Sequence, residues 1–151
     1  MANHSRDLVK NRRAYHDYEI LDSYEAGIVL KGTEIKSLRN HGGSLQEAYV
    51  KIFHNEVWLV GAHIAPYSHG NLHNHEERRD RKLLLHRREI DKLKSAFQED
   101  GMTLIPLALY LKNGKAKLKV GIAKGKQKAD KRSALRERQD LRDIQRSMKN
   151  Y

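Results

Sequence analysis

Hydrophobic and polar residues alternate along several stretches of the chain, and this spacing predicts a protein built mainly from β-strands. Residues 15–32 show the pattern first, because their apolar side chains recur at even spacing. The candidate inward positions are Tyr18, Ile20, Tyr24, Ile28 and Leu30. Gly27 lies inside this run and indicates a bulge or a close approach of the backbone to a neighbour.

Two β-hairpins are predicted further along the chain. Residues 48–64 have apolar-rich arms around a turn at residues 54–56, and Trp58, inside one arm, is expected in the core. Residues 103–123 contain Asn113–Gly114, the pair that favours a type I′ turn. After that turn, lysine alternates with apolar residues, so one face of the strand would carry only lysine: Lys115, Lys117 and Lys119.

Two helices are predicted between the strands. In residues 32–43 (GTEIKSLRNHGG), Thr33 is the candidate N-cap, Ile35 and Leu38 share a face, and the two glycines end the helix. A longer helix follows the apolar run that begins at residue 83, and it ends at Gly101. Its apolar stripe contains Ile90, Leu93 and Phe97.

This order of elements predicts a small antiparallel β-barrel, closed or partly open, with short helices appended to it. A chain of 151 residues has the length of one domain with a single core. We expect the barrel in residues 1–123, preceded by a loose N-terminal arm over residues 1–13. Residues 124–151 form a separate basic tail.

The charge of the chain indicates its type of partner. It has 30 lysine and arginine residues against 19 aspartate and glutamate residues, a formal net charge of +11, which favours polyanions. No apolar run approaches the roughly 20 residues of a membrane helix, and no signal-peptide core follows the first residues, so no membrane partner is expected. The absence of cysteine fits a reducing cytoplasm.

The tail carries about +6 of the net charge, from ten basic and four acidic residues. It has too little apolar surface to offset the entropy of ordering, so we expect disorder in the free protein and a helix on a polyanion. An ordinary solvated terminus remains the alternative. The weak apolar seam of such a helix would be Leu135, Leu141, Ile144 and Met148.

The sequence offers no catalytic centre that spacing can support, and no cofactor or small-molecule substrate is expected. Residues 63–86 hold five histidines, which raises a metal site and a metal-dependent ribonuclease as alternatives. No cysteine and no clear third ligand accompany them, and the carboxylates nearby lie beside arginines. The histidines are His63, His69, His73, His75 and His86.

Several stretches, taken in order over residues 11–132, resemble the SmpB family of tmRNA-binding (SsrA-binding) proteins. They are NRRAYHDYEI, YEAGIVLKGTEIKSLR, WLVGAHIAPY, RDRKLLLHRREIDKL, TLIPLALYLKNGKAKLKVGIAKGK and DKR. The resemblance implies an OB-type barrel that is not an enzyme. It also implies binding to the tRNA-like domain of tmRNA and delivery of that RNA to stalled ribosomes for trans-translation, with the protein replacing the missing anticodon arm. A general tRNA-binding or ribosomal protein is the alternative.

The resemblance also implies which residues bind tmRNA. Glu25 would accept hydrogen bonds from base or ribose donors, since an ionised carboxylate has no hydrogen to donate to a phosphate. Leu84 would pack on unstacked bases, with barrel core as the alternative, and His86 would donate a hydrogen bond or stack. Four further residues would contact phosphates: Lys36, Arg39, Arg81 and Lys82.

For the tail, the resemblance implies contacts with small-subunit ribosomal RNA at the decoding centre and along the empty mRNA channel. Gln127 and Ala129 depart from the family pattern, in which a third basic residue and a stacking ring can occur. Residues that match the tail signature are Gly125, Lys126, Asp130, Lys131 and Arg132.

Overall fold

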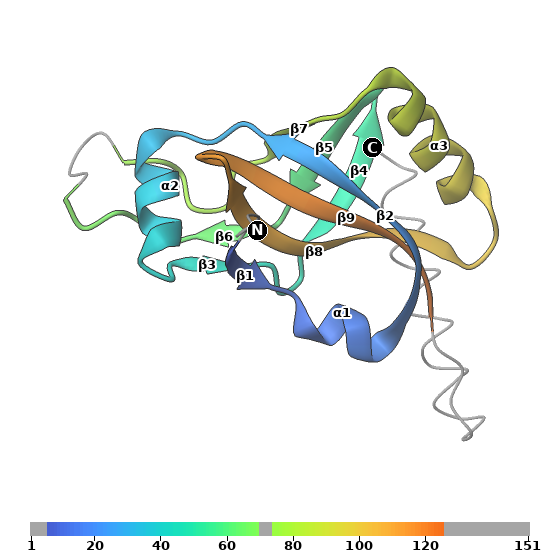
Figure 1. Cartoon of the computed structure of the whole chain (residues 1–151), viewed down its shortest axis with the longest axis horizontal. Helices are drawn as coiled ribbons and strands as arrows, with labels where there is room; N and C mark the ends of the chain where they lie inside the picture. The colour runs from blue at the N-terminus through green and yellow to red at the C-terminus, as the bar shows by residue number, and fades with distance from the viewer. Residues whose placement is uncertain (1–5, 70–73, 126–151) are drawn as a thin grey trace.

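The computed structural model describes residues 6–69 and 74–125, and within these ranges the protein is mainly antiparallel β-sheet (Figure 1). Seven strands pair in the order β1-β8-β9-β2-β7-β5-β4, and β3 pairs with β6 in a second, two-stranded sheet. The strands are β1 (Arg6–Lys10), β2 (Tyr18–Ile28), β3 (Gly43–Ser44), β4 (Tyr49–Phe53), β5 (Glu56–Val60), β6 (His63–Ile64), β7 (Arg81–Leu84), β8 (Met102–Lys112) and β9 (Lys115–Gly125). The helices are α1 (Arg12–Asp17), α2 (Gly32–Arg39) and α3 (Arg87–Gln98).

The hydrogen-bonded order begins at β1 and ends at β4, and among the described residues no ladder joins these two strands. The sheet is therefore the partly open form of the predicted barrel, and the mainly β, antiparallel fold is confirmed. The small β3–β6 sheet and α2 lie at one end of the molecule and α3 at the other (Figure 1). No helix of the described residues is long and apolar enough to cross a membrane.

Both predicted hairpins form. Asn113 and Gly114 have φ angles of 53° and 76° between β8 and β9, as a type I′ turn requires. His54 and Asn55, at 51° and 62°, join β4 and β5 in the same way. The β8–β9 hairpin is the longest ladder of the sheet, and it fixes which side chains of β9 face outward.

The core lies on the inner face of the sheet and is covered in part by α3. Leu93 of α3 is buried, with Ile90 and Phe97 packed beside it, so the predicted apolar stripe is confirmed. On the outer face, α1 covers a second, smaller cluster through Ala14. That cluster contains Ala14, Ile105, Leu107 and Ala123.

The loose arm predicted for residues 1–13 is wrong for its described part. Residues 6–10 form β1, which pairs with β8, and α1 follows at once. Asn11 links them: its Nδ2 donates to the Pro106 carbonyl at 2.8 Å, and its Oδ1 accepts from the Ala14 N–H at 3.3 Å. Pairing with a strand about a hundred residues away leaves no local pattern in the sequence, so periodicity could not find β1.

The predicted cap of α2 is also wrong. The helix begins two residues earlier than a Thr33 cap would require, with Lys31 as N-cap. Its buried face consists of Glu34, Ser37 and Leu38, while Ile35 is only half-buried. The hydroxyl of Thr33 instead pairs with His75 Nδ1 at 2.9 Å, which ties α2 to the loop before β7.

Candidate nucleic-acid interface

The outer face of β2, β7, β8 and β9 gathers lysines around one carboxylate and one exposed leucine. Cross-strand pairing places one residue of each strand side by side in a row. Gly27 of β2 lies opposite both Leu84 and Lys117, and Lys117 lies opposite Tyr110. Glu25, two residues before Gly27 on the same face, pairs with Lys119. We call this set the lysine face: Glu25, Leu84, Tyr110, Lys112, Lys115, Lys117 and Lys119.

Glu25 is held in place on this face by two groups of β8. The Tyr110 hydroxyl donates to Oε2 at 2.6 Å, and Lys112 Nζ lies 3.4 Å from Oε1. The hydrogen bond from Tyr110 is the largest influence on the pKa of Glu25 and lowers it; burial acts in the opposite direction, and Lys112 and Lys117 lower the pKa further. Glu25 is therefore an ionised acceptor at neutral pH, and its side chain is 35% exposed.

Leu84 is 53% exposed, so the alternative that it belongs to the core is wrong. It lies over Gly27: a Cβ placed on that glycine would come within 3.3 Å of Leu84 Cβ, which is the close approach that the sequence predicted. His86 is exposed, two residues beyond the end of β7, and is the N-cap residue of α3. Its backbone N–H donates to Glu89 Oε1 at 3.0 Å, which fixes the start of the helix.

The basic residues that the resemblance assigns to phosphate lie in different surroundings. Lys82 points outward from β7 and pairs with Glu56 at 2.8 Å. Lys36 and Arg39 are exposed on α2, where Lys36 Nζ lies 5.6 Å from the centre of the Tyr67 ring. These three side chains are accessible to a polyanion.

Arg81 is different, because the structure buries it completely. All five of its N–H donors are used internally. Nε donates to Glu34 Oε2 at 2.8 Å, and Nη1 donates to the carbonyls of Ala62 and Arg79. Nη2 lies 2.7 Å from Glu34 Oε2 and also donates to the Glu77 carbonyl at 3.1 Å. In this arrangement Arg81 has no donor left for a phosphate, and the direct contact expected from the sequence does not fit.

Glu34 is the centre of this buried ion cluster. Arg79 contributes two further hydrogen bonds to its carboxylate, of 2.6 and 3.0 Å, and the backbone N–H of Lys31 adds a third at 2.8 Å. Burial by itself would raise the pKa of Glu34, but the hydrogen bonds from Arg79, Lys31 and Arg81 outweigh it and the pKa is lowered. The cluster ties α2 to the strand that carries Lys82 and Leu84.

Glu34 is expected to make the protein less stable in acid. Because its pKa is lower in the folded than in the unfolded state, the unfolded state takes up the proton first as the pH falls. The stabilisation is complete above the unfolded value of about 4.3 and is lost as the pH falls through the folded pKa. Urea unfolding between pH 7 and pH 3 should therefore show a smaller loss of stability below that value in Glu34→Gln than in the native chain. Equal losses in both proteins would contradict this.

The histidines do not assemble a metal site within residues 6–69 and 74–125, where no group of three or more metal-binding side chains occurs. His75 is buried: its Nε2 donates to the Ile64 carbonyl at 2.9 Å while its Nδ1 pairs with Thr33. His63 Nε2 lies 3.1 Å from Glu77 Oε2. His73 lies outside the described residues.

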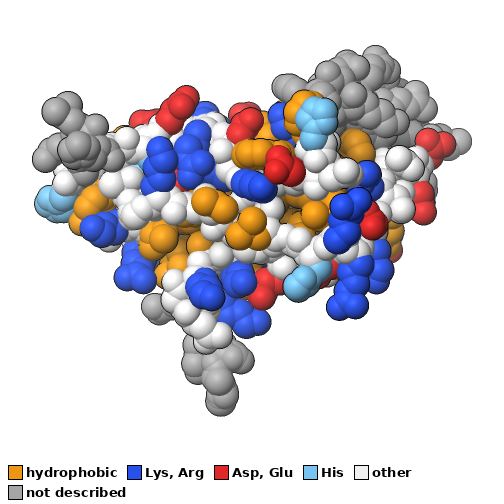
Figure 2. Space-filling view, turned by 90° about the horizontal axis from the view of Figure 1, so that it is seen from above, with side chains coloured by type: hydrophobic (Ala, Val, Ile, Leu, Met, Phe, Trp, Pro, Cys, Tyr) orange, Lys and Arg blue, Asp and Glu red, His pale blue; other side chains and the backbone are white. Residues whose placement is uncertain are grey.

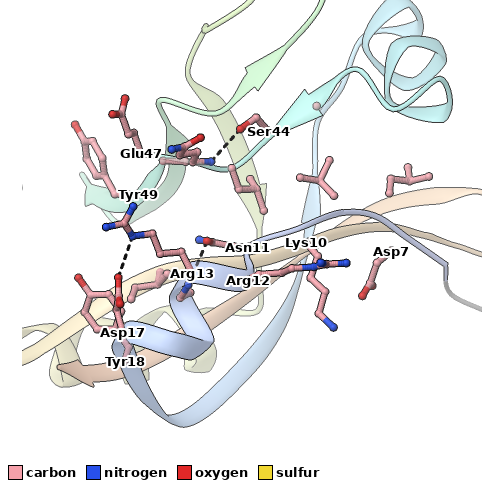
Figure 3. Close-up of a pocket in the computed structure, with 18 of the residues that line it drawn as sticks. Asp7, Lys10, Asn11, Arg12, Arg13, Asp17, Tyr18, Ser44, Glu47 and Tyr49 are labelled. Carbon is pink, nitrogen blue, oxygen red and sulfur yellow. Dashed lines mark hydrogen bonds and ion pairs between the residues drawn. The ribbon is translucent and has the colours of Figure 1, made fainter. Parts of the chain in front are cut away.

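A groove of about 960 Å³ lies between the β1–α1 segment and the segment that leads into β4 (Figure 3). Lys10, Arg12 and Arg13 line it, but so do three carboxylates. Arg13 crosses toward Asp17 and pairs with it at 3.2 Å (Figure 3). Because its three cations are matched by three carboxylates, these side chains give the groove no net attraction for phosphate. None of the residues predicted to bind RNA lines it.

The lysine face, in contrast, has four lysines and one carboxylate. Seen from above, the side on which β2 and β7 lie in Figure 1, Lys and Arg side chains lie next to exposed hydrophobic ones, with Asp and Glu side chains between some of them (Figure 2). Cations combined with exposed apolar groups are what RNA sites use to hold phosphates and unstacked bases. Among these residues the sequence reasoning missed Tyr110, which is part of an apolar run, and Lys112; the Asn113–Gly114 turn would have placed both opposite the lysine strand.

Most tail residues of the predicted ribosomal site lie beyond residue 125, where the described part of the chain ends. Gly125 ends β9, opposite Tyr18. The others lie outside the described residues: Lys126, Asp130, Lys131 and Arg132.

Comparison with known proteins gives matches over nearly the whole chain. The family model described as SmpB protein matches residues 8–150. The SsrA-binding protein of Protochlamydia amoebophila is 62% identical over 149 residues, covering 99% of this chain and 97% of the relative. That of Geobacillus kaustophilus is 51% identical and covers 94% and 92%. A solved chain described under "tmRNA-SmpB: a journey to the center of the bacterial ribosome" is 44% identical, with a TM-score of 0.69, and covers 85% of this chain and 94% of the solved one.

Proposed function

Because the chain belongs to the SmpB family, we propose that it binds the tRNA-like domain of tmRNA and delivers this RNA to stalled ribosomes for trans-translation. The observation that carries the proposal is the match over residues 8–150, joined to a described surface of the right chemistry. The protein acts as an RNA-binding protein without catalysis of its own, in the bacterial cytoplasm. Its RNA partners are tmRNA and the small-subunit ribosomal RNA.

In this proposal the lysine face receives the tRNA-like domain. Glu25 accepts hydrogen bonds from base or ribose donors, and Leu84, which protrudes beside it, packs on an unstacked base. Lys82, Lys36 and Arg39 contact phosphates and set the position of the RNA without reading sequence. Arg81 supports these contacts from inside by fixing β7 against α2. His86, at the start of α3, is placed to donate a hydrogen bond or stack at the border of the face.

The tail completes the function at the ribosome. Residues 126–151, with Gly125 as their attachment, would pass the decoding centre and enter the downstream mRNA channel when it is empty. Tail and intact message would compete for one space, so tail entry would report that the message has ended. Lys126, Asp130, Lys131 and Arg132 would make the contacts near the decoding centre.

A competition assay tests the RNA-binding part of this proposal. Labelled tRNA-like domain of tmRNA is bound to the full chain at about 150 mM salt, where non-specific attraction to phosphate is weakened. Unlabelled tmRNA domain and ordinary elongator tRNA then compete for the protein. We expect tRNA to compete at least about ten-fold more weakly, a difference of about 1.4 kcal/mol. Equal competition would instead identify a general tRNA-binding protein and refute the proposal.

A further inference from the structure

Tyr110 occupies an unusual position for a residue whose ring is buried. Only 8% of it is exposed, yet its hydroxyl reaches the lysine face and donates to Glu25 Oε2 at 2.6 Å. Burial, followed by the neighbouring carboxylate of Glu25, raises the pKa of this hydroxyl far above physiological pH. The group therefore remains a hydrogen-bond donor under all conditions in which the protein binds RNA.

We propose that Tyr110 is a positioning residue for RNA recognition: its hydroxyl fixes the Glu25 carboxylate so that Oε1 is presented outward to a base or ribose donor. This inference rests on the proposed function. It deepens that function by naming what makes a flexible glutamate, on the outer face of a strand, into an oriented acceptor. A free glutamate side chain has to lose rotamer freedom on binding, and a side chain that is already fixed has less to lose.

The other groups around Glu25 fix its carboxylate less firmly than Tyr110 does. Lys112 Nζ lies 3.4 and 3.5 Å from the two carboxylate oxygens, and its side chain is 49% exposed, so it is free to turn toward a phosphate. Lys117 acts through its charge, and Lys119 is the cross-strand partner of Glu25 on β9. Asp7 of β1 is the cross-strand partner of Tyr110, and its charge contributes to the raised pKa of the Tyr110 hydroxyl. Tyr110 alone among these groups combines a short hydrogen bond with a buried, immobile ring.

The arrangement also explains how a carboxylate serves an RNA site at all. Four lysines attract any phosphate backbone, whereas a fixed carboxylate repels phosphate and accepts only from N–H or O–H groups. Fixing the acceptor at one place among the lysines favours RNAs that bring a donor to that place. Tyr110 would thus contribute to the discrimination between tmRNA and other RNAs more than to affinity for RNA in general.

Tyr110→Phe tests the inference, because it removes the hydroxyl and keeps the buried ring. We expect the tRNA-like domain of tmRNA to bind about three- to ten-fold more weakly, and ordinary tRNA to bind about as before. In the Glu25→Gln background the same change should cause little further loss, since the carboxylate that Tyr110 positions is gone. A carbon-13 NMR titration of the Glu25 carboxyl should show a higher pKa in Tyr110→Phe than in the native chain.

Tyr24→Phe is the matched control. Tyr24 precedes Glu25 on β2, faces the opposite side of the sheet, and donates its hydroxyl to Asp22 at 3.3 Å. Loss of that hydroxyl should leave tmRNA binding unchanged. Native-like tmRNA binding by Tyr110→Phe, an equal loss in the Glu25→Gln background, or an unchanged Glu25 pKa would each overturn the inference. The proposed function fails separately, if the native chain does not prefer tmRNA over tRNA.

Discussion

Arg81→Met is expected to lower the free energy of unfolding by about 3–5 kcal/mol, the usual effect of removing one partner of a buried ion pair. The substitution keeps much of the side-chain length. Among the described residues it leaves the carboxylate of Glu34, which has no exposed surface, with Arg79 as its sole cationic partner. It also deprives four backbone carbonyls of a donor, those of Ala62, Glu76, Glu77 and Arg79. Urea unfolding followed by circular dichroism measures the loss.

Lys82→Met is the control for this prediction. Lys82 is the next residue along β7, but its pair with Glu56 is exposed, with side chains that are 41% and 44% accessible. Exposed pairs contribute about 0–1 kcal/mol, so stability should hardly change. For RNA binding we expect the reverse, with the larger effect in Lys82→Met and the smaller one in Arg81→Met. Lys82→Met should reduce the salt dependence of binding by about one phosphate contact, whereas Arg81→Met, measured where it is folded, should leave that slope intact. The opposite result would mean that Arg81 contacts phosphate.

The contrast between Arg81 and Lys82 shows where sequence reasoning stops. A resemblance can mark the stretch RKLLLH as important, but neighbouring residues of a strand face opposite sides. The stretch is basic and then apolar throughout, so its pattern does not tell which residues face the core. The pairing of β7 with β2 and β5 determines which residues face the core: Arg81 faces inward and Leu84 faces outward.

Trp58 illustrates the same limit. The sequence places it in a run of apolar residues, and we predicted it in the core. Val57 and Leu59 are the inward residues, and Trp58 is half-buried on the outer side between Lys51 and Lys82. A strand in which inward and outward positions are both apolar carries no alternation from which its faces can be assigned.

Local signals were reliable where a feature depends on neighbouring residues. The Asn113–Gly114 turn needs only its own two residues in the left-handed region, and the stripe of α3 repeats within a single helix. The Glu34 cluster had no such signal, because its arginines lie 45 and 47 residues away. A carboxylate in the first turn of a helix is an ordinary surface pattern, and only the fold brings these two arginines to it.

Removal of residues 126–151 is expected to abolish peptide tagging on stalled ribosomes while leaving tmRNA binding largely intact. The structure decides where to cut. Lys124 and Gly125 still pair with Glu19 and Tyr18 of β2, so a cut before Lys124 would shorten the central ladder, and a cut after Gly125 would not. The lysine face lies wholly within the retained chain. At about 150 mM salt we expect less than a ten-fold loss of affinity for the tRNA-like domain, since the tail charges add mainly non-specific attraction.

A chain whose residues 126–151 are scrambled provides the matched control, because it keeps the tail's length and charge. If tagging needs only positive charge in the mRNA channel, the scrambled chain should tag stalled peptides as the native one does. If the order Asp130, Lys131 and Arg132 matters at the decoding centre, the scrambled chain should bind tmRNA normally and tag as poorly as the truncated chain. This is the result that we expect. Both chains are compared in a reconstituted translation reaction on a message without a stop codon. Full tagging by the truncated chain would refute the division of labour between barrel and tail, because the lysine face alone would then suffice for rescue.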